Sequence, residues 1–146
     1  MVEIRDARSE DRARCLELLE VLMSAAGGSS DPGTGEIFDR FLDQQRGQIL
    51  VAVEDGTILG MATFSYGIAL RYGGEYCILE ELVVDPAGRG KNIGGLLLQT
   101  AIDVAKARGC ADFGVYLVEA TEHNLPFYEK YGFERVGSEL RQPLRD

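Results

Sequence analysis

The chain of 146 residues has 45% hydrophobic and 27% charged residues, a composition that fits one folded domain and excludes wholesale disorder. Its 24 acidic and 15 basic residues give a formal net charge of −9, which disfavours general binding to nucleic acid. The longest apolar run, residues 49–53, is too short to span a membrane, and the charged N-terminal residues do not fit a signal peptide. We therefore expect a single cytoplasmic domain over residues 1–146 that binds neither nucleic acid nor membrane.

The cysteines and the acidity narrow the chemistry further. Cys15, Cys77 and Cys110 are an odd number without a C-x-x-C pair, so we expect neither disulfides nor a metal site. Two interpretations of the negative charge remain open, namely simple solubility and an acidic cleft that attracts a cationic substrate.

The N-terminal part predicts one edge strand, at residues 2–4, and then two helices. Ser9 is the expected N-cap of the first helix, whose apolar residues recur at helical spacing until Gly27. Residues 27–35 form the expected loop, and a second short helix follows over residues 37–42.

The rest of the chain predicts a hairpin followed by alternating strands and helices. Asp55 and Gly56 suit a two-residue turn, because both residues tolerate positive φ. A glycine-rich loop is expected over residues 67–74, and one or two strands are expected after Phe133. The expected strands are residues 49–53, 58–64, 76–84 and 113–118, and the expected helices are residues 93–108 and 125–131. This order predicts a mixed α/β layer.

A strand that leads through a glycine-rich turn into a helix, at residues 84–98, is the most informative feature. Glycines let a ligand approach the backbone closely, and the unpaired N–H groups and the dipole of a helix start attract anions. Arg89 and Lys91 add positive charge, so the turn is expected to bind phosphate or pyrophosphate. A tight turn that binds no ligand is the alternative.

Two familiar phosphate-binding motifs do not fit the spacing of this turn. A P-loop needs Gly at position 85 and Ser or Thr at position 92, where the chain has Asp85 and Asn92. A dinucleotide fingerprint needs Gly at position 93, which is Ile93, and normally follows the first strand of a βαβ unit.

A third pattern fits. The stretch Arg89-Gly-Lys-Asn-Ile-Gly94 resembles the [Q/R]-x-x-G-x-[G/A] coenzyme A turn of the GNAT superfamily of acyl-CoA N-acyltransferases. Phe127-Tyr-Glu-Lys-Tyr-Gly-Phe133 is similar to the later F-Y-x-x-x-G-F signature of that family, and the order of elements matches along the whole chain. Asn92, Thr121 and Asn124 depart from the residues that are usual in the family.

The resemblance implies an α/β (α+β) GNAT fold. This is a mixed, mostly antiparallel central sheet of six to seven strands, with helices on both faces and a splayed V between the fourth and fifth strands. It also implies acetyl-CoA as cosubstrate, an amine acceptor and no metal, and it leaves a homodimer open. The residues implied for coenzyme binding are Leu82, Val83, Val84, Arg89, Gly90, Lys91, Asn92, Ile93, Gly94, Gly95, Asn124, Phe127 and Tyr128.

Acyl transfer to an amine needs a base for the amine proton and an acid for the leaving thiolate. Glu80 and Glu81 are the candidate bases, and the resemblance, which implies a bulge in their strand, favours Glu80. Adjacent strand residues face opposite ways, so we expect one carboxylate in a cleft and the other on the opposite face or against a helix. The resemblance makes Tyr128 the general acid in a direct attack within a ternary complex. Purely structural roles for these three residues are the alternative.

The acceptor is not defined by the sequence. The acidity suits a small cationic amine such as a polyamine, an aminoglycoside or an amino sugar, bound by residues 27–35, the second helix and residues 67–74. Protein N-termini or lysines are alternative acceptors, and a non-catalytic regulatory module that binds coenzyme A is the alternative from another class.

Overall fold

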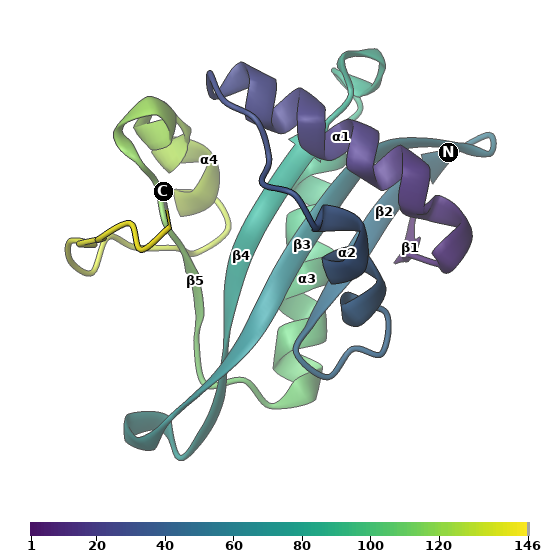
Figure 1. The fold of residues 1–146 in the computed structure, drawn as a ribbon. Helices are drawn as coiled ribbons and strands as arrows, with labels where there is room; N and C mark the ends of the chain where they lie inside the picture. The colour runs from purple at the N-terminus through teal and green to yellow at the C-terminus, as the bar shows by residue number, and fades with distance from the viewer. Residues whose placement is uncertain (146) are drawn as a thin grey trace. The chain divides into compact units, whose positions relative to one another are not determined.

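The computed structural model describes residues 1–145, which form two compact units, Met1–Val115 and the segment that starts at Tyr116. The first unit is built on one five-stranded sheet in the order β1-β2-β3-β4-β5 (Figure 1). Its strands are β1 (Glu3–Asp6), β2 (Gly47–Glu54), β3 (Thr57–Ala69), β4 (Gly74–Val84) and β5 (Phe113–Val115). β1 to β4 pair antiparallel and β5 pairs parallel to β4, so the sheet is mixed, as predicted.

Helices cover both faces of this sheet. α1 (Arg12–Ala25) and α2 (Thr34–Phe41) lie on one face, and α3 (Ile93–Arg108) lies on the other (Figure 1). Alternate residues of the central strands point to the two faces, so each face buries its own apolar set. The core under α1 and α2 consists of Cys15, Leu18, Phe38, Ile49, Val51, Ile58, Met61 and Val83.

Helix α3 approaches the sheet closely because β3 has a glycine beneath it. A Cβ atom at Gly60 would lie 2.7 Å from Cγ2 of Ile93 and 3.2 Å from Cδ1 of Leu97. Ile93, the first residue of α3, is only 1% exposed. The start of α3, which is also the end of the glycine-rich turn, is therefore fixed against the sheet.

The hairpin between β2 and β3 is confirmed, with φ of 51° at Asp55 and 78° at Gly56. The loop predicted at residues 67–74 is confirmed only for residues 70–73. β3 runs to Ala69 and β4 begins at Gly74, with the short 3-10 helix Leu70–Tyr72 and Gly73 between them. Gly67 lies inside β3, and the ring of Tyr76 packs over it. A Cβ atom at this position would be 2.6 Å from that ring, so only glycine fits there without a shift.

The start of the first helix also differs from the prediction. Ser9 begins a 3-10 helix, Ser9–Asp11, and α1 follows from Arg12. Asp11, which is 8% exposed, accepts a hydrogen bond of 2.8 Å from the backbone N–H of Arg8, so this carboxylate caps the segment instead of Ser9.

The second unit has a short 3-10 helix, Glu119–Asn124, and α4 (Leu125–Glu129), after which Gly132 has a φ of 93°. The strands expected after residue 133 are absent from the described residues, and β5 ends at Val115 instead of residue 118. The sheet of the described chain thus has five strands, not six to seven. The apolar side chains of Val136, Leu140 and Leu144 in the tail are almost fully exposed. No burial of apolar surface therefore stabilises a strand in this part of the described chain. Among residues 1–145, no helix is long and apolar enough to cross a membrane.

Candidate active site

A β-bulge in β4 lies at the two adjacent glutamates. Thr63 of β3 pairs with Glu81 and Phe64 pairs with Leu79, so Glu80 is the extra residue with no partner on β3. A bulge of this kind breaks the alternation of side chains along its strand. The bulge that the family resemblance implied is therefore present at Glu80.

The bulge brings both carboxylates to the same face of the sheet. The Ser65 hydroxyl donates to the Glu80 carboxylate, and the Thr63 hydroxyl donates to the Glu81 carboxylate. Because Thr63 and Ser65 are two residues apart in β3, their side chains share one face, which is the face of Met61 under α1 and α2. The expectation that the two glutamates point to opposite faces was wrong, since the extra residue of the bulge cancels the alternation.

The two carboxylates differ in their surroundings. Glu80 is exposed, whereas Glu81 is half-buried and its pKa is raised, mainly by burial and also by the nearby charge of Glu80. The hydrogen bond from Thr63 acts in the opposite direction and lowers the pKa of Glu81. The site thus combines a reachable carboxylate with one that takes up a proton more easily than an ordinary glutamate.

The edge of β4 beside the bulge is open toward β5. Parallel pairing with β5 joins only Cys77, Ile78 and Leu79 to Phe113–Val115, and β4 continues for five residues beyond it. β5 ends opposite Leu79, so the splayed V expected between the fourth and fifth strands stays a prediction. Backbone groups of Leu82, Val83 and Val84 lie along this edge, where an extended ligand can pair with them.

The glycine-rich turn has the geometry of an anion cradle. Gly90 has a φ of 81° with open space beside its Cα, and Asn92 has a left-handed φ of 58°. Asparagine tolerates this conformation, as predicted for the departure from glycine. The N–H groups of Ile93, Gly94 and Gly95 begin α3 and have no acceptor within the helix, and Arg89 is exposed beside them. These features fit a pyrophosphate group.

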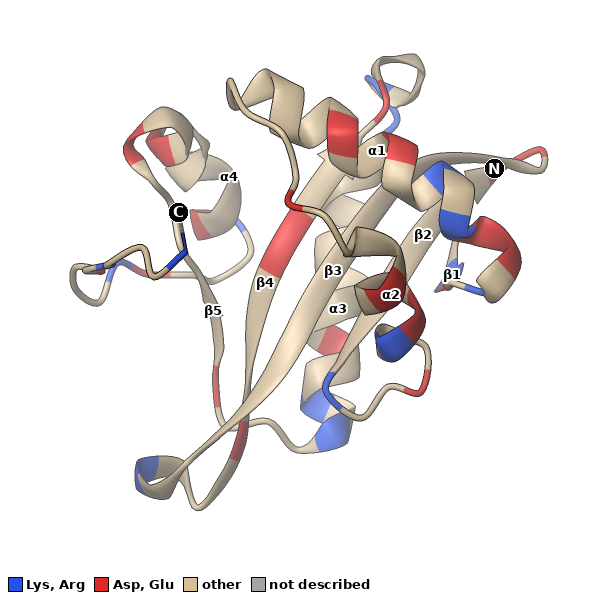
Figure 2. Ribbon diagram, in the orientation of Figure 1, with Lys and Arg blue, Asp and Glu red and all other residues tan. Residues whose placement is uncertain are grey.

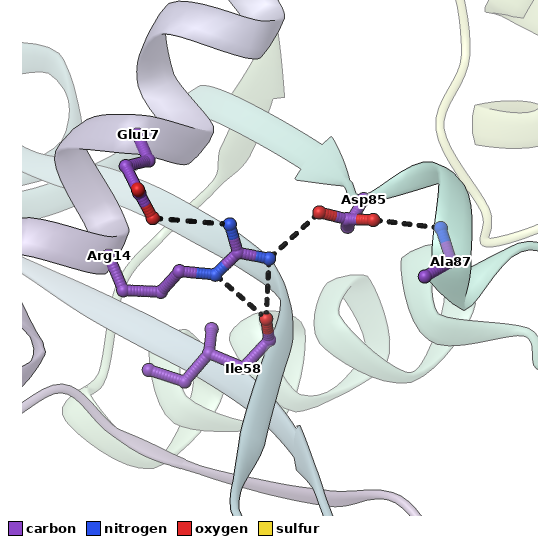
Figure 3. Close-up of polar contacts among 5 residues, drawn as sticks. All are labelled: Arg14, Glu17, Ile58, Asp85 and Ala87. Carbon is purple, nitrogen blue, oxygen red and sulfur yellow. Dashed lines mark hydrogen bonds and ion pairs between the residues drawn. The ribbon is translucent and has the colours of Figure 1, made fainter.

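An arginine of α1 holds the beginning of this turn (Figure 3). The Arg14 guanidinium donates two hydrogen bonds, of 3.1 and 2.9 Å, to the carbonyl oxygen of Ile58 and one of 2.8 Å to Asp85 Oδ2. The other oxygen of Asp85 accepts the N–H of Ala87 at 2.8 Å. Arg14 keeps the pKa of Asp85 below its ordinary value, so the turn starts from a neutralised ion pair and not from a bare negative charge.

Lys91 of the turn is also paired. Its Nζ atom lies 2.5 Å from Oε1 of Glu54 at the end of β2, and this contact lowers the pKa of Glu54. A phosphate at the turn therefore competes with Glu54 for the lysine charge.

The remaining predicted residues belong to the second unit. Tyr128 is 8% exposed, and burial raises the pKa of its hydroxyl. Its ring packs edge-on against Phe127 and Phe133, at centroid distances of 5.1 and 5.8 Å. Asn124 precedes α4 and is exposed.

Three residues of the site were not predicted from the sequence: Thr63, Arg14 and Glu54. Thr63 and Ser65 are two residues apart in a mostly apolar strand. This spacing indicates two hydroxyl groups on one face of the sheet, so the sequence did contain a signal for them. Arg14 and Glu54 gave no local signal, because their partners are 71 and 37 residues away. Within residues 1–145, no cluster of three or more His, Cys, Asp or Glu side chains is arranged to hold a metal ion.

The mixed sheet and the turn before α3 have the arrangement expected of an acyltransferase that uses acyl-coenzyme A. The chain belongs to the acetyltransferase (GNAT) family, whose model matches residues 13–133. It is therefore an acyltransferase enzyme, and the GNAT fold inferred from the turn and the F-Y-x-x-x-G-F signature is confirmed.

Two relatives to which the chain is similar have names that refer to different acetyl acceptors. Glucosamine 6-phosphate N-acetyltransferase of Trypanosoma brucei brucei is 28% identical over an alignment of 149 positions, which covers 98% of this chain and 96% of the relative. N-alpha-acetyltransferase RimI of Mycobacterium tuberculosis is 32% identical over an alignment of 138 positions, which covers 90% of this chain and 77% of the relative. A crystal structure of an acetyltransferase from Trypanosoma brucei is 27% identical with a TM-score of 0.80, covering 99% of this chain and 100% of that one.

Proposed function

We propose that this enzyme transfers the acetyl group of acetyl-CoA to a primary amine of a small cationic molecule, by direct attack in a ternary complex. The observation that carries the proposal is the bulge, which presents Glu80 and Glu81 together on one face beside the open edge of β4. A free alkylamine has a pKa near ~10.4, so at neutral pH it is about a thousandfold protonated and needs a base.

The proposed roles follow from exposure and charge. Glu80 is exposed and takes the proton of the ammonium group, directly or through one water, while the charge of Glu81 favours the cationic acceptor. Acetyl-CoA supplies the activated acetyl group, held by Arg89, Lys91 and the backbone from Gly90 to Gly95. As the C–N bond forms and the C–S bond breaks, Tyr128 gives its proton to the leaving sulfur, and the second proton that the nitrogen loses on becoming an amide restores the Tyr128 hydroxyl through solvent. An ordinary phenol holds its proton at neutral pH, and burial, which raises the pKa of Tyr128, keeps the hydroxyl in this protonated form.

The charges of α1 and α2 support a cationic acceptor. Figure 2 shows acidic segments on both helices and in the middle of β4. Between Cys15 and Asp39 the chain has no lysine, arginine or histidine, and its acidic residues there are Glu17, Glu20, Asp31, Glu36 and Asp39. A second ammonium group on the acceptor would be attracted by this surface.

The same charges disfavour the phosphorylated sugar in the name of the Trypanosoma relative. The two arginines of α1 are both engaged, Arg12 with Asp39 at 3.4 Å and Arg14 with Asp85 at 2.8 Å. A phosphate bound by Arg12 or Arg14 would have to break one of these pairs. We therefore rank polyamines and aminoglycosides above glucosamine 6-phosphate, and peptide N-termini between them.

The test is thiol release from acetyl-CoA with spermidine, an aminoglycoside, a short peptide and glucosamine 6-phosphate as acceptors. We expect the polycationic amines to give the highest kcat/KM. Tyr128→Phe should lower kcat by about 10² to 10⁴ with little change in the KM for acetyl-CoA. The matched control Tyr131→Phe, three residues later in the same signature, should behave like the parent. Preferred turnover of glucosamine 6-phosphate would contradict the charge argument, and full activity of the Tyr128 variant would remove it as the acid.

A further inference from the structure

The hydroxyl of Thr63 makes two hydrogen bonds to one residue. Its oxygen accepts the backbone N–H of Glu81 at 3.1 Å, and its proton goes to the carboxylate of the same glutamate. Thr63 is 5% exposed and lies at the register shift itself, where pairing passes from Glu81 to Leu79. One buried side chain thus contacts both the backbone and the side chain of the bulge.

A hydroxyl can do this because it is both a donor and an acceptor. Valine has the same shape but neither function, so at this position it would leave a backbone N–H without its partner and a carboxylate without its donor. Serine keeps both functions and loses only a methyl group. Thr63→Val therefore removes both hydrogen bonds without changing the shape of the side chain, and Thr63→Ser is the conservative variant that keeps them.

We propose that Thr63 is a positioning residue of the acetyl transfer, which fixes the bulge around Glu80 and favours the ionised form of Glu81. This inference rests on the proposed function, because it assumes that the two carboxylates serve the amine. Thr63 does not touch the acceptor in this scheme and acts through Glu81.

The charged groups around Glu81 are few. β3 and β5 contain no charged residue, and on β4 the charge that acts on Glu81 is that of Glu80. α1 packs against β4, and its charged side chains all have partners elsewhere. These pairs are Arg12 with Asp39, Arg14 with Glu17 and Asp85, and Glu20 with Ser30. The Thr63 hydroxyl is therefore the main local group that favours the ionised form of Glu81.

The experiment compares the parent with Thr63→Val, Thr63→Ser and the control Thr57→Val, an exposed threonine of the same strand. Thr63→Val should move the acid limb of the kcat/KM profile upward by about one pH unit and lower kcat about tenfold, since a hydrogen bond to a charged group has been lost. The KM for acetyl-CoA should stay unchanged. Thr63→Ser should restore the profile, and Thr57→Val should not alter it.

Titration of the Glu81 carboxyl by carbon-13 NMR gives a readout that does not need activity. Thr63→Val should raise this pKa by about one unit, and Thr63→Ser should return it. Two results would overturn the proposal. One is an unchanged pKa of the Glu81 carboxyl in Thr63→Val. The other is an equal loss of activity in Thr63→Ser and Thr63→Val that follows only their melting temperatures. If the parent acetylates no amine, the proposed function fails, and the NMR titration alone then decides whether Thr63 controls Glu81.

Discussion

Replacing Gly60 by alanine tests whether the contact between α3 and the sheet positions the coenzyme turn. The added Cβ atom would lie 2.7 Å from Cγ2 of Ile93, 3.1 Å from the carbonyl oxygen of Val83 and 3.2 Å from Cδ1 of Leu97. Ile93 is fully enclosed, so it cannot rotate away, and the start of α3 must move instead. Overpacking of this kind costs about 1–3 kcal/mol, which lowers the melting temperature of a domain of this size by about 3–10 °C.

The assay is thermal unfolding together with titration of acetyl-CoA. Because Ile93 ends the turn, Gly60→Ala should also weaken acetyl-CoA binding. Gly74→Ala is the matched control, since that strand glycine has no positive φ and nothing within 4 Å of an added Cβ atom. A Gly60 variant that melts within a degree of the parent and binds acetyl-CoA equally well would refute the link between the sheet and the turn.

Three further changes test the charges of the first unit. Glu54→Gln should free Lys91 and tighten acetyl-CoA binding roughly two- to threefold at low salt, and this effect should vanish at high salt. Weaker binding would contradict the competition between Glu54 and the phosphate for Lys91. Arg14→Met should raise the KM for acetyl-CoA several-fold with kcat almost unchanged. Asp85→Asn added to Arg14→Met should recover part of the loss. Simple additivity of the two effects on KM would show that the ion pair does not matter. Asp11→Asn should cost about 1–3 kcal/mol at pH 7. Arginine pairing lowers the folded pKa of Asp11, so its contribution is present above the ordinary aspartate range and is lost as pH falls through the folded pKa. Melting curves should therefore show a gap between variant and parent at pH 7 that closes as pH falls below the ordinary aspartate range, and a constant gap would contradict this.

Features of the fold that depend on neighbouring residues could be predicted from the sequence. The Asp55-Gly56 turn and the left-handed Gly109 at the end of α3 follow from local backbone preferences. The anion-binding turn could also be predicted, because glycine, basic residues and a helix start lie within ten residues of one another. Even the substitution of Asn92 for glycine was interpreted correctly from its tolerance of positive φ.

Features that depend on the register between strands could not be predicted from the residue pattern, and the bulge was expected from the family resemblance alone. Which glutamate loses its partner is decided by the pairing of β4 with β3, so sequence alternation alone placed the two carboxylates on opposite faces. The number of strands failed for a similar reason, since a strand exists only where another strand pairs with it, and residues 133–145 have none in the described chain. Long-range pairs such as Arg14 with Asp85 have no local pattern at all.

The most direct test of the proposed chemistry is the pH dependence of kcat/KM for the preferred amine, measured for the parent and for Glu80→Gln, with Glu3→Gln as a matched exposed strand control. If Glu80 is the base, the Glu80 variant should lose about 10² in kcat/KM near pH 7 and recover toward pH 10, where the amine loses its own proton. Its affinity for acetyl-CoA should be unchanged, and the Glu3 variant should follow the parent. A Glu80 variant with the parent profile across the whole pH range would contradict the account of the bulge as the catalytic centre.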